Sequence, residues 1–203
     1  MIFYLVRHAE FSAKSAGYED YETNAMAPLS DFGRTEAKAL GALLKSKGID
    51  RIYYSPFVRA RETAEIIHQA TGAPAVELAE LVEHKIIPDV KERQAYKVLR
   101  DAMRADHAHA PNGSESFADA ALRMRGVLEE LATSGERICI IAHALLLQAT
   151  LTKLFSLDKV PNLSTASITT VAYEQGNFRL LRLNERPMSI PLIFAKIRRK
   201  VRL

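Results

Sequence analysis

Cysteine is almost absent from this chain of 203 residues, which contains only Cys139. A single cysteine excludes a disulfide framework and a thiol-rich metal site, and it favours a reducing compartment. The apolar runs are too short for a membrane-spanning helix, and the first residues lack the basic and apolar pattern of a secretory signal. We therefore expect one cytoplasmic domain, because this length suits a single core.

Over most of the chain, basic and acidic residues nearly balance, so there is little excess charge of either sign. The formal net charge is +4, but residues 186–203 hold six of the 28 basic residues and no acid, which leaves 22 bases against 24 acids in residues 1–185. A slightly acidic body argues against a nucleic-acid surface, so we expect no nucleic-acid partner. The charge step suggests a catalytic domain over residues 1–185 and a basic tail over residues 186–203.

The tail combines an apolar stripe at helical spacing with a basic arc. The stripe consists of Ile190, Ile193, Phe194, Ile197 and Val201. Such a helix packs on the body or on a second subunit, or it lies on an anionic membrane surface. Because a short isolated helix is marginal, we favour packing and keep peripheral membrane contact as the alternative.

Alternating strand and helix patterns organise the body. A buried strand starting at Ile2 is followed by a polar loop through Asn24. The further expected elements are a helix over Leu29–Lys47 with Ser30 as N-cap, a strand over Arg51–Tyr54, a helix over Val58–Ala70 closed by Gly72, a strand including Val76 and Leu78, a helix with a stripe of Phe117, Leu122, Val127, Leu128 and Leu131, a strand over Arg137–Ala142, a helix over Ala144–Phe155 and a hairpin of Ile168–Tyr173 and Phe178–Leu183.

This order predicts a three-layer α/β/α sandwich with a mostly parallel sheet and an antiparallel edge. The pattern loosens between residues 84 and 111, where a helical stretch over Val90–Met103 is flanked by Pro88 and by His107 and His109. We interpret residues 84–111 as a small cap insertion. The two histidines lack further ligands nearby, so we expect them to be exposed and not to bind a metal.

Cations and imidazoles follow three of the predicted strands. Arg7 and His8 end the first strand, Arg59 lies shortly after the second, and His143 ends the strand over Arg137–Ala142. Ligands bind outside the carboxyl ends of strands in open α/β sheets. Guanidinium forks with a neutral imidazole form an arrangement that suits phosphate recognition and transfer. Each residue taken alone has an ordinary structural explanation, and the prediction depends on the combination.

Together these residues resemble the histidine phosphatase superfamily, which has the phosphoglycerate mutase-like fold. Ala9 stands in the usual glycine position of the Arg-His-Gly signature, and the likeness runs from about Ile2 to Leu183. The ordered motifs are Leu5-Val6-Arg7-His8-Ala9-Glu10, Pro28-Leu29-Ser30-x-x-Gly33-x-x-Glu36-Ala37, Ser55-Pro56-x-x-Arg59-Ala60-x-x-Thr63-Ala64-Glu65, Gly113-x-Glu115-Ser116-Phe117 and Ile141-Ala142-His143-Ala144.

The resemblance implies that His8 is the nucleophile that becomes phosphohistidine, and that Arg7, Arg59 and His143 bind the phosphoryl oxygens. It implies no metal and no cofactor. The family's general acid follows the third strand, where Glu83 in Leu81-Val82-Glu83 fits best and Glu80 is the rival. The glycine-and-tryptophan stretch that often follows this acid is replaced by residues 84–88, so the choice between Glu83 and Glu80 stays open.

Two further polar residues near the motifs have simpler interpretations. Lys14 stands where an asparagine is common in the family, and we favour a solvent-exposed side chain. Glu115 precedes a helix, and we expect it to cap that helix.

The function implied is metal-independent hydrolysis of a phosphorylated small molecule. The alternatives are a phosphoglycerate mutase-type phosphotransferase, a protein phosphohistidine phosphatase and a non-catalytic binder of phosphorylated ligands. Residues 11–24 do not resemble the corresponding mutase segment, and residues 84–111 form a cap that phosphohistidine phosphatases usually lack. The sequence names neither the substrate nor the oligomeric state.

Overall fold

The computed structural model describes residues 1–12, 21–88, 93–159, 162–187 and 192. Its elements are β1 (Ile2–Arg7), α1 (Tyr21–Ala25), α2 (Asp31–Lys45), β2 (Arg51–Tyr54), α3 (Val58–Thr71), β3 (Ala75–Glu77), η1 (Ala79–Leu81), α4 (Arg93–Ala105), η2 (Pro111–Gly113), α5 (Phe117–Leu131), η3 (Ala132–Ser134), β4 (Arg137–Ala142), α6 (Ala144–Phe155), β5 (Ile168–Glu174) and β6 (Asn177–Glu185). Lys14 and most of the basic tail lie outside the described residues, so the expectations for them remain predictions.

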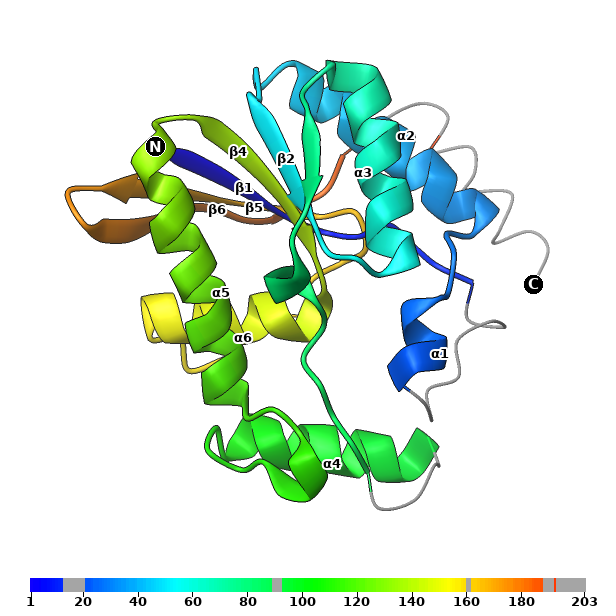
Figure 1. Cartoon of the computed structure of the whole chain (residues 1–203), viewed down its shortest axis with the longest axis vertical. Coiled ribbons are helices and arrows are strands. Elements are labelled where there is room, and N and C mark those ends of the chain that lie inside the picture. Colours follow the sequence, from blue (N-terminus) through cyan, green and yellow to red (C-terminus); the bar gives the residue numbers. More distant parts are fainter. Residues whose placement is uncertain (13–20, 89–92, 160–161, 188–191, 193–203) are drawn as a thin grey trace.

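One six-stranded sheet organises the chain, with the strands in the order β3-β2-β4-β1-β5-β6 (Figure 1). The first four of these strands are parallel, whereas β5 runs antiparallel to β1, and β6 antiparallel to β5. The predicted parallel sheet with an antiparallel edge is therefore confirmed. Because β1, β2 and β4 are parallel, the residues that follow them emerge at the same edge of the sheet.

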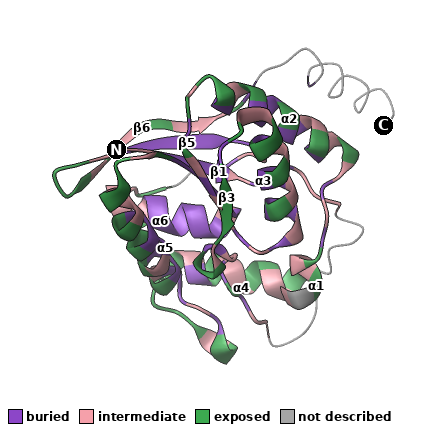
Figure 2. Cartoon of the chain, turned by 45° about the horizontal axis from the view of Figure 1, so that its top comes forward, coloured by how far each residue is buried: buried purple, intermediate pink, exposed green. Residues whose placement is uncertain are grey.

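Helices cover both faces of the sheet, with α2 and α3 on one side and α5 and α6 on the other (Figure 1). Alternate residues of β1 serve the two cores: Phe3 and Leu5 pack with α5 and α6, while Tyr4 and Val6 pack with α2 and α3. Figure 2 shows β1, β5 and α6 as mostly buried. A strand buried on both faces reads as a continuous apolar run, which is why its end was visible in the sequence.

Helix ends follow the local chemistry of the sequence. The Ser30 hydroxyl caps α2 by accepting a hydrogen bond from the Gly33 N–H at 3.0 Å, as predicted. Gly72 closes α3 at a φ of 76°, in the left-handed region that glycine enters at low cost. The bounds of β2 and α6 agree with the sequence prediction. The predicted cap contains α4, which is two residues longer at its C-terminal end than expected.

Four local expectations are wrong. Leu78 lies directly after β3, which ends at Glu77, and is not part of the strand. Leu122 is 54% exposed, because the buried stripe of α5 runs instead through residues such as Ala121 and Met124. The cap of α5 is Ser116, whose hydroxyl accepts from the Asp119 N–H, and not Glu115. Tyr21–Ala25, which were expected to belong to a loop, form a short helix, α1.

Gly33 in α2 allows the loop after His8 to lie against the helix. A Cβ built on Gly33 would stand 1.8 Å from the Glu10 carbonyl oxygen. The same carbonyl accepts a hydrogen bond from the Ser30 N–H at 3.0 Å. The glycine is therefore required by the close approach of two backbones, since no side chain fits between them.

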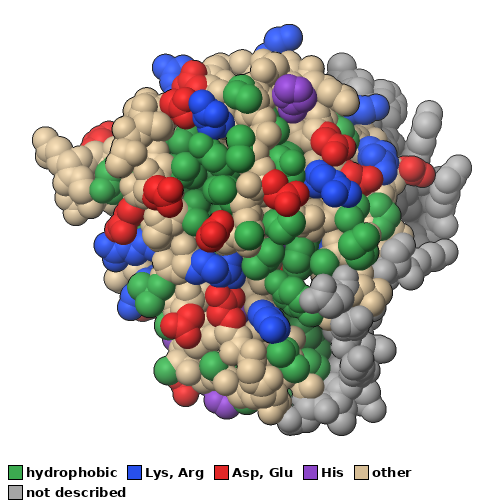
Figure 3. Space-filling model, in the orientation of Figure 1, with side chains coloured by type: hydrophobic (Ala, Val, Ile, Leu, Met, Phe, Trp, Pro, Cys, Tyr) green, Lys and Arg blue, Asp and Glu red, His purple; other side chains and the backbone are tan. Residues whose placement is uncertain are grey.

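The described part of the face shown in Figure 3 carries charges of both signs. On the face shown in Figure 3, acidic and basic side chains are interspersed rather than gathered by sign. Among the described residues, no helix has the length and apolarity to traverse a membrane.

Candidate active site

Residues after three parallel strands meet at one edge of the sheet. The backbone hydrogen bonds continue beyond the strands, from the His8 N–H to the Ala142 carbonyl and from the Ser55 N–H to the Ile141 carbonyl, both at 3.0 Å. His143 follows β4 directly, and its ring lies 5.1 Å from the His8 ring between centroids. The predicted convergence of the two histidines is therefore observed.

Hydrogen bonds define the tautomer of His8. Its Nδ1 lies 2.8 Å from the Ala9 carbonyl oxygen, which can only accept, so Nδ1 carries the proton. Its Nε2 lies 3.1 Å from the Nε of Arg59, which can only donate, so Nε2 is unprotonated. This assignment rests on the hydrogen-bond network. The imidazole thus presents a lone pair on Nε2, as a nucleophile must.

Electrostatics favour the same neutral state. The pKa of His8 is well below its ordinary value because the ring is buried, and because the Arg59 and Arg7 guanidiniums oppose a further positive charge. Burial and Arg59 also hold the pKa of His143 well below its ordinary value. Both imidazoles are therefore neutral at pH 7.

Arg59 is fixed on several sides by neighbouring groups. Its Nη1 donates to the Asn24 carbonyl at 2.6 Å, and its Nη2 donates to the Asn24 Oδ1 at 3.0 Å. The guanidinium carbon lies 4.7 Å from the ring centroid of Phe11 and 5.0 Å from that of Phe57. Burial lowers the pKa of Arg59 to about 10, so the side chain remains a cation at neutral pH.

Arg7 and His143 complete the environment of His8. Arg7 lines the pocket, and its Nη1 donates to the Leu163 carbonyl at 2.5 Å. His143 is fully buried beside His8, and its Nε2 lies 2.8 Å from the Ser55 hydroxyl oxygen. The Nδ1 of His143 is buried and has no hydrogen-bond partner among the residues that the structure describes. The structure thus places His143 next to the His8 ring rather than in the open part of the pocket.

Glu83, and not Glu80, reaches the pocket. The Glu83 carboxylate accepts hydrogen bonds from the N–H groups of His84 and Leu146 at 2.9 Å and of Leu145 at 3.3 Å. Two of these donors belong to the first turn of α6, where the helix dipole also favours a negative charge. Glu80 is exposed and does not line the pocket, so of the two candidate carboxylates it is Glu83 that lies beside His8 and Arg59 in the cavity.

An ion pair that the sequence did not predict supports the segment before Glu83. The Arg123 guanidinium donates to both carboxylate oxygens of Glu115 at 2.8 Å. The third nitrogen of Arg123 donates to the backbone carbonyls of Glu80 and Val82. Glu115 therefore holds the arginine that fixes the chain directly before Glu83.

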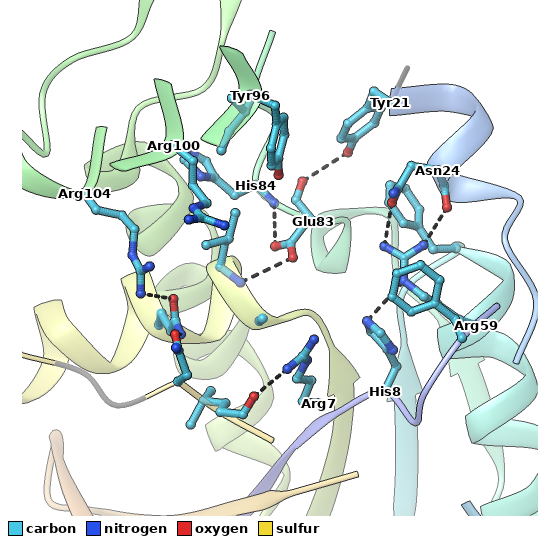
Figure 4. Close-up of a pocket in the computed structure, with 18 of the residues that line it drawn as sticks. Arg7, His8, Tyr21, Asn24, Arg59, Glu83, His84, Tyr96, Arg100 and Arg104 are labelled. Carbon is cyan, nitrogen blue, oxygen red and sulfur yellow. Dashed lines mark hydrogen bonds between the residues drawn. The ribbon is translucent and has the colours of Figure 1, made fainter. Parts of the chain in front are cut away.

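A cavity of about 380 Å³ unites these groups (Figure 4). Its lining includes four predicted residues, Arg7, His8, Arg59 and Glu83, and several that sequence reasoning missed: Phe11, Tyr21, Asn24, Phe57, Tyr96, Arg100, Arg104, Gln148 and Asn162. The sequence indicated these residues only through their location, because they lie in segments near the strand ends or in the cap.

No metal-binding cluster of three or more His, Cys, Asp or Glu residues occurs within the described ranges. His107 and His109 are both exposed, as expected. Cys139 is a buried free thiol, and burial raises its pKa, so it is not poised for thiolate chemistry.

Comparison with known proteins shows the family to which the chain belongs. Residues 3–186 match the model of the histidine phosphatase superfamily, branch 1. The chain therefore belongs to this superfamily, which confirms the resemblance drawn from its motifs.

Named relatives differ in the activities that their names state. The adenosylcobalamin/alpha-ribazole phosphatase of Salmonella typhimurium is 39% identical over 83 residues, which span 41% of this chain and 40% of that protein. The probable phosphoglycerate mutase GpmB of Serratia proteamaculans is 27% identical over 188 residues, or 85% of each chain. A mycobacterial glucosyl-3-phosphoglycerate phosphatase, solved with inorganic phosphate, has a TM-score of 0.76 and 23% identity over 93% of this chain and 99% of that one, which shows a shared fold.

Proposed function

We propose that this chain is a phosphatase that hydrolyses phosphomonoesters through a phosphohistidine on Nε2 of His8, with no requirement for a metal ion. The observation that carries the proposal is the hydrogen bonding of His8, which leaves Nε2 unprotonated in a pocket that Arg7 and Arg59 also line. A neutral imidazole nitrogen is a nucleophile, and positioned cations stabilise the charge on a transferring phosphoryl group.

In the first step, Nε2 of His8 attacks phosphorus and the bond from phosphorus to the ester oxygen breaks. The Nε–H of Arg59 now donates to Nε2 at 3.1 Å. When Nε2 becomes bonded to phosphorus, that donor turns to an equatorial phosphoryl oxygen, beside Arg7. Protonated Glu83 gives its proton to the departing oxygen, which leaves as an alcohol.

In the second step, the Glu83 carboxylate takes a proton from water and the water oxygen attacks the phosphohistidine. The bond from Nε2 to phosphorus breaks, and inorganic phosphate leaves a neutral imidazole behind. The three backbone N–H donors around Glu83 hold its carboxyl group in a fixed position in both steps. In both steps, the nucleophile, the cations and the group that transfers the proton are therefore side chains of this chain.

The proposal is tested with an aryl phosphate in the presence of a chelator. The wild type should release phosphate, and His8→Ala should not, whereas His109→Ala, at an exposed histidine, should match the wild type. Acid-labile, base-stable label should appear on the wild-type protein when rapid-quench experiments use a labelled phosphoryl group. Equal background rates for wild type and His8→Ala, or dependence on added metal, would contradict it.

A phosphotransferase is the second candidate because a relative that aligns over 85% of the chain is named as a mutase. The two activities differ in the final acceptor of the phosphoryl group. Incubation with 3-phosphoglycerate and a bisphosphoglycerate primer distinguishes them, since hydrolysis yields inorganic phosphate and a mutase yields the isomer. We expect inorganic phosphate.

A further inference from the structure

The pocket contains a second basic wall that the proposed chemistry does not use. Arg100 and Arg104, both on α4, line the same cavity as His8 and Arg59. In Figure 4 they lie on the left, with Glu83 between them and the His8–Arg59 pair on the right. The cavity therefore has cations at two separate places, and only those beside His8 are needed to bind one phosphoryl group.

The placement of α4 explains why these two arginines face the cavity. Met103 is fully buried against Ile86 and Leu145, with Leu99 packed on the same small cluster. Tyr96, Arg100 and Arg104 follow one another at intervals of four residues, so they form a neighbouring stripe along the helix. All three line the pocket once the apolar face is seated on the body.

Arg104 is held in place by a neutral partner. Its Nη2 donates to the Gln148 Oε1 at 2.6 Å, and Gln148, 3% exposed, bonds through Nε2 to the Asn162 Oδ1 at 3.4 Å. Within the described part of the chain, no acidic side chain forms an ion pair with Arg104. A positioned guanidinium with only an amide acceptor has its charge available for an anion.

Arg100 differs because it has an acidic neighbour. It donates to the Asp101 Oδ1 at 2.8 and 3.0 Å, but Asp101 is half exposed and does not line the cavity. An ion pair with an exposed partner contributes little and exchanges readily. Arg100 can therefore turn its remaining donors to a bound anion beside Arg104.

The charges of the residues that line the cavity indicate which kind of ligand it can bind. Among the described lining residues are four guanidiniums, those of Arg7, Arg59, Arg100 and Arg104, and one carboxylate, that of Glu83. A phosphomonoester dianion beside His8 offsets Arg7 and Arg59, which leaves the α4 pair without a counter-charge from the substrate's phosphate. A ligand with a second anionic group at its other end would pair with the arginines of α4 as well as with those beside His8.

We propose that Arg104, assisted by Arg100, forms a second anion subsite, and that the substrate class is a small phosphomonoester with a distal carboxylate or second phosphate. This inference rests on the proposed function for the phosphomonoester end. Gln148 is a positioning residue, which orients Arg104 toward the ligand. The subsite selects substrates by their far end, while His8 acts at the near end.

The test measures binding, so that it does not depend on turnover. Alkyl phosphonates of matched chain length, ending in a carboxylate, a second phosphonate or a primary alcohol, are titrated by calorimetry into the full-length protein. A hydrogen-bonded charge pair corresponds to about 10- to 100-fold in affinity. We expect at least one of the two anionic phosphonates to bind more tightly than the alcohol by this factor. Comparison of the carboxylate with the second phosphonate then identifies which group the subsite binds.

Variants separate a subsite from a merely structural helix contact. Arg104→Gln should remove the preference and leave the affinity for the alcohol unchanged, and Arg100→Gln should reduce the preference. Lys97→Gln takes one charge from an exposed position of α4 outside the pocket, and it should keep the preference. If Arg104→Gln weakens all ligands equally, its role is structural and the inference is wrong.

Two failures remain distinguishable. Equal affinity of the wild type for acid and alcohol, together with His8-dependent hydrolysis of an aryl phosphate, would overturn the subsite and leave the phosphatase intact. Selective binding of anionic ends without any hydrolysis would support the subsite and overturn the phosphatase.

Discussion

Arg123 and Glu115 face each other through two hydrogen bonds of 2.8 Å, and the arginine's remaining nitrogen donates to the carbonyls of Glu80 and Val82. A lysine keeps the charge of Arg123 but cannot supply this planar fork. Arg123→Lys should therefore displace Glu83, lowering kcat about tenfold or more while KM for an aryl phosphate changes little. Steady-state kinetics measure this split.

The matched control for Arg123 is Arg125 on the same helix. Arg125 is about half exposed and pairs with Glu129 one turn away. Arg125→Lys should keep both kinetic constants. A parallel loss of kcat in both variants, or a rise in KM alone for Arg123→Lys, would contradict the positioning role.

Glu83→Gln should separate the two steps of the reaction. The amide can neither give a proton to the leaving group nor take one from water, so turnover should fall about 100-fold or more. With an aryl phosphate, whose leaving group needs little protonation, the label should accumulate on His8. Rapid-quench measurement of protein-bound phosphate checks this, and Glu80→Gln, at an exposed carboxylate, should behave as wild type.

The buried neutral histidines make stability depend on pH. The pKa values of His8 and His143 lie well below 6.5 in the folded chain, so the unfolded chain binds more protons as the pH falls below that value. The free energy of unfolding therefore decreases with falling pH, by about 1.4 kcal/mol per histidine at one unit below. At higher pH this loss is absent.

The difference between variants isolates this effect from other titrating groups. Glu36 opposes it, because burial raises the pKa of its carboxyl. His8→Gln should show a smaller decrease in unfolding free energy between about pH 7 and pH 5.5 than the wild type, by roughly the contribution of one histidine. His109→Gln, at an exposed ring, should follow the wild-type curve in urea titrations.

Gly33→Ala should damage both stability and activity. The added Cβ would lie 1.8 Å from the Glu10 carbonyl oxygen, so the loop after His8 or helix α2 must move. Overpacking of this kind costs about 1–3 kcal/mol. The Cβ of Gly126→Ala on α5 would meet no described atom within 4 Å, and this variant should instead stabilise the protein by about 0.5–1 kcal/mol. Thermal unfolding and the rate of aryl phosphate hydrolysis measure both variants.

Residues next to strand ends were predictable because local pattern determines them. A strand buried on both faces is an apolar run, so the positions of His8 and His143 followed from where those runs stop. The N-cap at Ser30 and the glycine stop at Gly72 are equally local, since each depends on hydrogen bonds within one turn.

The contacts that the sequence did not predict join residues far apart in the chain. Asn24 binds Arg59 across 35 positions, and the short helix α1 has no apolar periodicity that would announce it. Arg104 contacts Gln148 across 44 positions. The apolar character of Leu122 predicts a buried position, but the buried face of α5 runs through Ala121 and Met124 instead. Such pairings depend on the packed fold rather than on spacing.

The small apolar contact between α4 and the rest of the protein has a practical consequence for engineering. This helix meets the body through a few apolar residues, Ile86, Leu99, Met103 and Leu145, rather than through the two cores that support the sheet. Segments of other lengths and charges could thus be grafted between Pro88 and Pro111 while the imidazole at the end of β1 keeps its surroundings. Exchange of this one helix offers a route to altered substrate choice without redesign of the scaffold.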